Sequence, residues 1–230
     1  MFSRAKSVTL VLTLLLLVAL DLWGSVGVLA FALATVVTFF FTIGYNLLVE
    51  RLLLRLQALA PQGCSIYDRA FWRHERFWKM SSVNYLNAFN GTPYKTLLWR
   101  LMGARIGRRV FDDGCFLTER TFTTVGHDCT LNAGSVVQCH SQEDGGFKSD
   151  YTVIGAGCTL GVNAFIHYGV TVGDGAVLAT DSFLMKGEEM PPNATWGGNP
   201  AKQMREHSGD VPVRKTSIDD NRAAVLVAGS

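Results

Sequence analysis

A histidine beside an interruption in a regular repeat is the strongest candidate for chemistry in this chain of 230 residues. The run Cys139–Ser141 (CHS) is followed by a polar segment, Glu143–Val153 (EDGGFKSDYTV), in which the repeat described below is lost. The imidazole of His140 can accept a proton near neutral pH, and such general-base catalysis is typically worth about 10²–10⁴-fold. We therefore predict that His140 is a general base at an open corner of the fold, beside a loop formed by Glu143–Val153. An exposed turn histidine is the alternative.

Two acidic residues open the polar segment. Glu143 and Asp144 follow His140 within a few residues, where a carboxylate could orient the imidazole or hold a cationic substrate. Equally, these residues could only solvate the loop. His167 is a further candidate, since the repeat places it one coil above Gln138, in a groove beside His140 or simply on the surface.

The repeat itself predicts the fold. Every sixth residue is aliphatic at nine positions: Val125, Leu131, Val137, Ile154, Leu160, Ile166, Val172, Leu178 and Leu184. Four residues after the first eight of these stands a small or slim residue: Cys129, Ser135, Ser141, Cys158, Ala164, Val170, Ala176 and Ser182. A period of six fits neither an α-helix nor a single strand. It fits a coil with three flat faces, whose turns stack about 4.8 Å apart and bury the aliphatic side chains inside. We predict a mainly β fold, a parallel β-helix of about four coils in a domain at residues 104–205, with a bulge near Thr118–Thr124.

The N-terminal part of the chain predicts a membrane anchor. From Val8 to Val49 the only charged residue is Asp21, and the stretch is too long for one bilayer crossing of about 20 residues. A break at residues 21–25 divides it into spans at about Ser7–Leu22 and Val26–Val49. Basic residues lie outside both spans, which favours a transmembrane hairpin at residues 1–50 with both ends in the cytoplasm, at the plasma (inner) membrane. A cleaved signal peptide is the alternative.

Residues 51–103 are predicted to contain amphipathic linker helices. Tyr67–Lys79 interleaves aromatic and basic residues, which is typical of a helix lying at a lipid surface. We favour that role over a substrate-binding role for His74 and Glu75. A second helix is expected at Tyr94–Met102, ending at Gly103. The tail at residues 206–230 has no period and is predicted to be disordered.

Composition excludes some classes of partner and site. The formal net charge of +2 gives no indication of a nucleic-acid partner. Five cysteines, an odd number without a CxxC pair, favour reduced thiols over a disulfide framework or a zinc ribbon.

Several motifs together resemble a known family. The elements are the CHS run before the excursion, Ile154–Gly157 (IGAG) and the closing run Gly198–Lys202 (GNPAK). Residues 90–204 resemble the hexapeptide-repeat acyltransferases, and the runs FWRHERFWK, FNGTPYKTLLWR and CHSQEDGGFKSD resemble the C-terminal membrane-linked units of poly-ε-lysine-synthetase-type nonribosomal peptide synthetases. The resemblance implies a left-handed β-helix, a homotrimer and a general base at His140.

The resemblance also implies a set of binding residues. Asp113 aligns with the substrate-binding asparagine of the family, which suggests a catalytic position and, with Asp112 and Glu119, a positively charged acceptor. The closing turn with Trp196, Gly198 and Asn199 would pass a pantetheine chain. The implied donor is a pantetheine thioester, carried as 4′-phosphopantetheine on a carrier protein domain or, alternatively, supplied as acetyl-CoA.

These observations predict an acyltransferase. The predicted reaction moves an acyl or aminoacyl group from the thioester to a small-molecule amine and forms an amide, as in polylysine-type synthesis. Few basic residues are available for the nucleotide phosphates of CoA, which favours the carrier; these are Lys148, Lys186, Lys202, Arg205, Arg214 and Lys215.

The sequence suggests three alternative functions. The first alternative is a CoA-dependent O- or N-acetyltransferase acting on a cell-envelope saccharide. A zinc enzyme of the γ-type carbonic anhydrase kind is disfavoured, because His127, His140 and His167 are not closely spaced, and no metal site is predicted. A non-catalytic scaffold would leave His140 and the adjoining segment unexplained.

Overall fold

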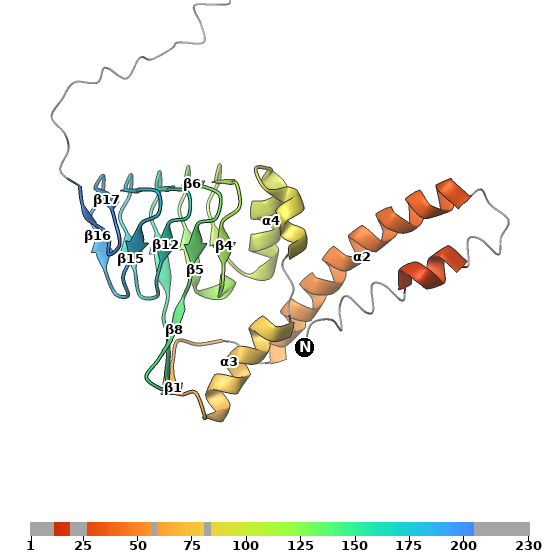
Figure 1. Cartoon of the computed structure of the whole chain (residues 1–230), viewed down its shortest axis with the longest axis horizontal. Helices are drawn as coiled ribbons and strands as arrows, with labels where there is room; N and C mark the ends of the chain where they lie inside the picture. The colour runs from red at the N-terminus through yellow and green to blue at the C-terminus, as the bar shows by residue number, and fades with distance from the viewer. Residues whose placement is uncertain (1–11, 19–26, 57–58, 81–83, 205–230) are drawn as a thin grey trace, which may run out of the picture.

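The computed structural model of the chain describes residues 12–18, 27–56, 59–80 and 84–204. Figure 1 shows two regions: a stack of short strands, and an N-terminal region of helices in which one long helix runs away from the stack. The predicted tail and the break between the two spans lie outside the described residues.

Three parallel sheets form the walls of a coil. The first contains β2 (Arg105–Ile106), β5 (Thr123–Val125), β10 (Thr152–Ile154), β13 (Thr171–Val172) and β16 (Glu189–Met190). The second contains β3 (Phe111–Asp112), β6 (Thr130–Leu131), β11 (Thr159–Leu160), β14 (Val177–Leu178) and β17 (Thr195–Gly197), with β18 (Lys202–Gln203) antiparallel at its edge. The third contains β4 (Phe116–Leu117), β7 (Val136–Val137), β12 (Phe165–Ile166) and β15 (Phe183–Leu184). Because the chain visits the three sheets in turn, it makes four complete coils and two strands of a fifth, and the prediction of a β-helix of about four coils is confirmed.

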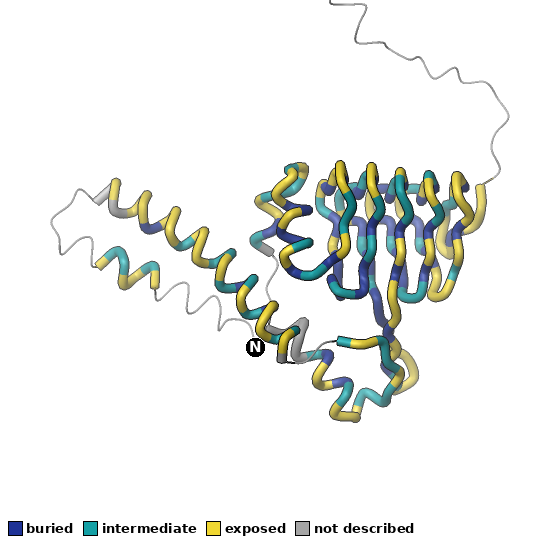
Figure 2. The backbone as a smooth tube through the Cα atoms, turned by 180° about the vertical axis from the view of Figure 1, so that it is seen from behind, coloured by how far each residue is buried: buried dark blue, intermediate teal, exposed yellow. Residues whose placement is uncertain are grey.

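The interior of the coil is filled as the six-residue period predicts. All nine repeated aliphatic side chains are at most 2% exposed, and the small residues four positions later are buried as well. The buried residues line the inside of the stacked turns in Figure 2. Stacking also explains the glycines that follow some of the aliphatic residues. A Cβ on Gly126 would lie 2.5 Å from the backbone nitrogen of Ala156 in the next coil, and one on Gly161 equally close to the backbone of Ala179.

A bulge interrupts the first coil, as predicted. The 3₁₀ helix η2 (Arg120–Phe122) follows β4 and precedes β5, where eight residues, in place of the usual six, separate the repeated positions Leu117 and Val125. The extra residues are accommodated by the η2 turn, because the N–H of Phe122 donates to the carbonyl of Glu119 at 3.0 Å.

The predicted loop after the second coil is folded as a β-hairpin. Strands β8 (His140–Glu143) and β9 (Gly146–Ser149) pair antiparallel, and β1 (Gly63–Ser65) adds a third strand to β9. The turn between β8 and β9 is Asp144–Gly145, with φ of 51° and 71°. Asp-Gly favours a two-residue hairpin turn with both residues in the left-handed region, and this local signal explains the hairpin.

The N-terminal region contains α2 (Gly27–Leu56), α3 (Arg69–Met80), the 3₁₀ helix η1 (Asn84–Phe89) and α4 (Pro93–Met102). Helix α4 begins one residue before its predicted start and ends, as predicted, at Gly103, whose φ is 108°. Among the described residues, one helix is long and apolar enough to cross a membrane, over Phe31–Arg55. Many of its large apolar side chains are exposed, unlike those of a core helix.

The predicted transmembrane hairpin is described only in part. Residues 12–18 are helical, and Thr13 Oγ1 lies 2.8 Å from Thr38 Oγ1 of α2. The rest of the first predicted span lies outside the described residues, so the hairpin stays a prediction.

Candidate active site

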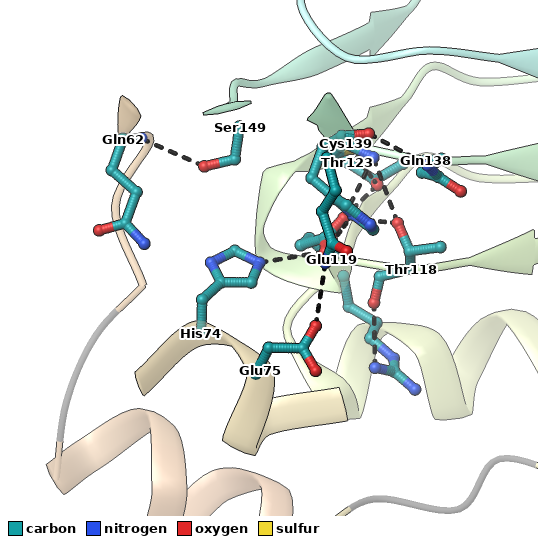
Figure 3. Close-up of polar contacts among 12 residues, drawn as sticks. Gln62, His74, Glu75, Thr118, Glu119, Thr123, Gln138, Cys139 and Ser149 are labelled. Carbon is teal, nitrogen blue, oxygen red and sulfur yellow. Dashed lines mark hydrogen bonds and ion pairs between the residues drawn. The ribbon is translucent and has the colours of Figure 1, made fainter. Parts of the chain in front are cut away.

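A buried carboxylate, Glu119, lies at the centre of the candidate site. It immediately precedes η2, so the bulge sets its position, and it is 0% exposed. One oxygen, Oε1, is 2.8 Å from Nδ1 of His140 and 3.1 Å from Nε2 of His74. The other, Oε2, accepts hydrogen bonds from the hydroxyl of Thr118 at 2.5 Å and the backbone N–H of Cys139 at 3.1 Å. Figure 3 shows His74 approaching Glu119 from outside the coil.

These contacts keep Glu119 ionised. Burial by itself raises the pKa of the carboxyl, but the hydrogen bonds from His140 and His74, together with the charge of His140 and the bond from Thr118, outweigh it and lower the pKa to about 2. A carboxylate accepts hydrogen bonds only, so Nδ1 of His140 must carry the proton that it shares with Glu119. Proton acceptance then falls to Nε2 of His140, as the orientation of an imidazole by a carboxylate requires.

The imidazole of His140 is covered, where the sequence predicted an open corner. Its residue is 5% exposed, and Phe147 of β9 stacks on it with ring centroids 5.7 Å apart and planes 24° apart. The cover exists because β8 and β9 fold as a hairpin, which brings Phe147 back over the strand that carries His140. A covered imidazole is shielded from water.

Glu143 and Asp144 do not orient His140. Both are exposed, at the end of β8 and in the hairpin turn. Glu143 forms an ion pair with Lys186, and this hydrogen bond lowers the pKa of Glu143. The prediction that Glu143 supports the imidazole is therefore corrected, and Glu119, which the sequence suggested only as a substrate contact, takes that position.

Asp112 ends β3, and Asp113 follows it at another corner of the coil. Asp112 is 1% exposed; it accepts the indole N–H of Trp99 at 2.9 Å and lies 3.4 Å from Nζ of Lys95. It also accepts the backbone N–H of Gly114, so its carboxylate has a structural role in place of the predicted substrate contact. Asp113 is exposed, and one chain does not bring it to His140, which follows β7 at the next corner.

His167 lies where the repeat predicted. Strand β12 stacks on β7 in register, which sets His167 above Gln138, and the pairing of Ile166 with Leu184 sets Met185 above His167. Nδ1 of His167 accepts the backbone N–H of Tyr168 at 3.0 Å, so a neutral ring carries its proton on Nε2. Burial lowers the pKa of His167, which favours that neutral form.

The closing turn lies at the far end of the same face. Trp196 of β17 is half-buried against the end of the core, and Asn199 is exposed. Gly198 has a φ of 95°; its N–H donates to Ser182 Oγ at 3.1 Å and its carbonyl accepts the N–H of Phe183. These residues lie several coils away from His140 along the stack.

The sequence reasoning missed His74 as part of this site. It is 1% exposed and lies three residues after the buried Phe71, whereas Trp72 and Arg73 between them are exposed. The three-residue spacing was the available signal, since it places His74 on the buried side of α3. The mixture of aromatic and basic residues pointed instead to lipid. Within the described residues, no group of three histidine, cysteine or acidic side chains is arranged to hold a metal ion.

Comparisons with known proteins agree with the repeat of the coil. A family model described as the hexapeptide repeat of succinyl-transferase matches residues 151–184. The chain is 30% identical over 138 residues to Escherichia coli (strain K12) WcaF, which is named as a colanic acid biosynthesis acetyltransferase; the match covers 49% of this chain and 75% of WcaF. The chain therefore belongs to the hexapeptide-repeat acyltransferase family, and it is an acyltransferase. Membership implies that the coil is left-handed, as predicted.

Another relative is much longer than this chain. The delta-poly-L-ornithine synthetase of Acinetobacter baumannii (strain AB307-0294) is 29% identical over 145 residues, which cover 61% of this chain but 11% of the synthetase. Among solved structures, a galactoside acetyltransferase in complex with coenzyme A aligns with a TM-score of 0.47 and 17% identity, covering 63% of this chain and 86% of that one.

Proposed function

We propose that this chain transfers an acyl group from a pantetheine thioester to an amine, with His140 as the general base and Glu119 as the carboxylate that orients it. The observation that carries the proposal is the 2.8 Å contact between Nδ1 of His140 and Oε1 of the fully buried Glu119. A carboxylate in this place fixes the tautomer of the imidazole and stabilises the imidazolium that forms when Nε2 takes a proton.

One imidazole both accepts and returns the proton that moves in the proposed reaction. The amine nitrogen attacks the thioester carbonyl carbon, a C–N bond forms, and the proton of the amine passes to Nε2 of His140. The tetrahedral intermediate then collapses, the C–S bond breaks, and the imidazolium returns the proton to the departing sulfur. The products are an amide and a free thiol.

The acidic residues near the hairpin support an amine as the acceptor. Glu75 of α3 is half-exposed and accepts a hydrogen bond at 3.1 Å from the side chain of Gln142, two residues beyond His140. Asp144 is exposed in the adjoining turn. A cationic chain end is attracted by such carboxylates, whereas an anionic acceptor is repelled. The similarity to a polyornithine synthetase supports the same chemistry, because the name of that enzyme describes a polymer of an amino acid with two amines.

The donor arm is proposed to run along the column of residues Gln138, His167 and Met185 toward the turn at Gly198. This column starts beside His140 and follows the stacked coils, as the register of β7, β12 and β15 requires. Pantetheine is common to CoA and to carrier proteins, so the column suits either donor. The alternative function, O- or N-acetylation of an envelope saccharide from acetyl-CoA, is favoured by the match to three quarters of WcaF.

Assembly and location complete the proposal. A homotrimer anchored by α2 in the plasma membrane, with the coil in the cytoplasm, would bring a second chain against each coil. The exposed Asp113 could reach the site of His140 only from such a neighbour, since the two lie at different corners of one chain.

The test offers purified protein two donors: a lysine thioester on a carrier domain, and acetyl-CoA, each with free lysine as the acceptor. Amide formed from the carrier supports aminoacyl transfer, and amide formed from acetyl-CoA alone supports the acetyltransferase. In both cases His140→Ala must remove the product, and His127→Gln, at an exposed histidine of another corner, must not. Unchanged product with His140→Ala would overturn the proposed base.

A further inference from the structure

His74 is a buried histidine that reaches the site from outside the coil. It belongs to α3, it is 1% exposed, and its Nε2 lies 3.1 Å from the same oxygen of Glu119 that His140 contacts. Its other nitrogen, Nδ1, is buried and has no hydrogen-bond partner among the described residues.

We propose that His74 is a positioning residue for acyl transfer: as a neutral hydrogen-bond donor it holds the Glu119 carboxylate against His140. This inference rests on the proposed function, because it assigns to His74 an effect on the base that the proposed function assigns to His140.

The hydrogen-bond inventory determines the form of His74. Glu119 only accepts, so Nε2 of His74 must donate to it. A second proton on Nδ1 would be a buried donor without an acceptor, which is unfavourable. The neutral tautomer, with its proton on Nε2 alone, satisfies both conditions. A neutral donor fixes the carboxylate without neutralising it, so the full negative charge of Glu119 is kept for the imidazolium that forms at His140.

Packing fixes the ring of His74 in that orientation. Its centroid lies 4.7 Å from the ring of Phe147 and 6.1 Å from that of Phe122 in η2. On the preceding turn of α3, the buried Phe71 contacts Phe147 edge-on at 5.4 Å. The hairpin residue that covers His140 is therefore the residue against which α3 docks, and the docking of α3 sets the position of Glu119. Because His74 is covered on these sides, it acts through Glu119 and not by touching substrate.

Three variants of His74 separate the effect of hydrogen-bond donation from the effect of side-chain size. In His74→Gln the amide nitrogen takes the place of Nε2 and can still donate to Glu119. In His74→Met a side chain of similar length cannot donate, and in His74→Asn the amide is too short to reach the carboxylate. We expect Met and Asn to lower kcat by about 10–100-fold, the usual range for a residue that orients a functional imidazole or its partner. KM should change less than about twofold, and Gln should recover most of kcat.

The pH profile adds a readout that a purely structural role would not move. The hydrogen bond from His74 lowers the pKa of Glu119, so its loss lets the carboxylate take up a proton at higher pH. The acid limb of the kcat profile should therefore shift to higher pH in His74→Met and return toward wild type in His74→Gln.

The outcomes are distinct. Wild-type kcat in His74→Met, or a His74→Gln variant as slow as His74→Asn, would overturn the inference. If the Met variant does not fold, the comparison of Gln with Asn carries the test alone. His140→Ala, measured beside them, separates the two proposals. Retained activity in His140→Ala refutes the proposed function, whereas its loss together with an unaffected His74→Met refutes only the role of His74.

Discussion

The coil and the N-terminal helices contribute to the site in different ways. In the coil, each six-residue repeat places one aliphatic side chain in the interior, and these interior side chains are almost completely buried. The helices have little of such a buried interior, but they place single polar side chains against the η2 bulge. His74 of α3 contacts Glu119, and Glu50, in the last turns of α2, lies 3.4 Å from Arg120 with both side chains buried. Two adjoining residues of the η2 bulge are thus held from outside the coil.

Stability and the proposed catalysis therefore depend on different parts of the chain. In the proposed mechanism, the coil supplies the base and a rigid frame, and the bulge supplies the carboxylate that orients the base. The helices fix that bulge. The site therefore depends on helices that do not follow the six-residue repeat.

The largest effect is expected for the base. Replacing His140 with Ala removes proton transfer and should lower kcat by about 10²–10⁴-fold. The thermal unfolding midpoint should fall as well, because the change removes the contact of Nδ1 with the fully buried Glu119, so kcat is corrected for the folded fraction. Turnover within threefold of wild type would contradict this assignment.

The two regions should differ most clearly in stability. Leu160→Ala empties a fully buried position in the third coil and should lower the free energy of unfolding by about 2–5 kcal/mol. The matched change Leu33→Ala, at a leucine of α2 that is 50% exposed, should alter it by less than about 0.5 kcal/mol in detergent. Denaturant unfolding followed by circular dichroism measures both. Equal effects would remove the distinction between a packed coil and an outward-facing helix.

The buried carboxylate should give a defined acid dependence. The pKa of Glu119 is lowered from 4.5 to about 2, so the ionised form stabilises the folded state. That contribution is complete above about pH 4.5 and is lost as the pH falls toward 2, and by linkage it amounts to roughly 3 kcal/mol. Unfolding of wild type and Glu119→Gln should therefore converge in this range. Asp128→Asn, at the exposed ion pair with Arg109, should behave as wild type at every pH.

A smaller question concerns the orientation of α2. Basic residues outside both predicted spans predict that residues 50–230 lie in the cytoplasm. Cysteine labelling of intact cells from outside should modify a probe at Ser25 and leave one at Ser208 unmodified. The opposite pattern would place the coil on the other side of the membrane.

The fold of the coil could be predicted from the sequence, whereas most of the contacts that position the side chains of the site could not. A period of six in Val, Ile and Leu has one good packing solution, so the fold, the η2 bulge and the stacking of His167 above Gln138 followed from counting residues. His140 was predictable because it adjoins the interruption. The hairpin carried a local signal in Asp144–Gly145, but nothing local shows that a strand so formed folds back and brings Phe147 over the imidazole.

The contacts of Glu119 could not be read from the sequence for a different reason. They join residues 45 and 21 positions apart through the docking of α3 on a bulge, and no repeat relates those positions. The same holds for Asp112, whose burial with Lys95 depends on how α4 packs over the start of the coil. Charge near a histidine in sequence, as in Glu143, was therefore a poor guide to charge near it in space.

The central claim is that Glu119 and His140 work as one unit, and a double-mutant cycle tests it most directly. The measurement is kcat for Glu119→Gln, His140→Ala and the double variant, each corrected for its folded fraction. If Glu119 acts by orienting His140, its replacement has nothing left to disturb once the imidazole is gone, so the double variant should be as slow as His140→Ala and no slower. A double variant whose loss equals the product of the two single losses would show that the residues act independently and would contradict the account.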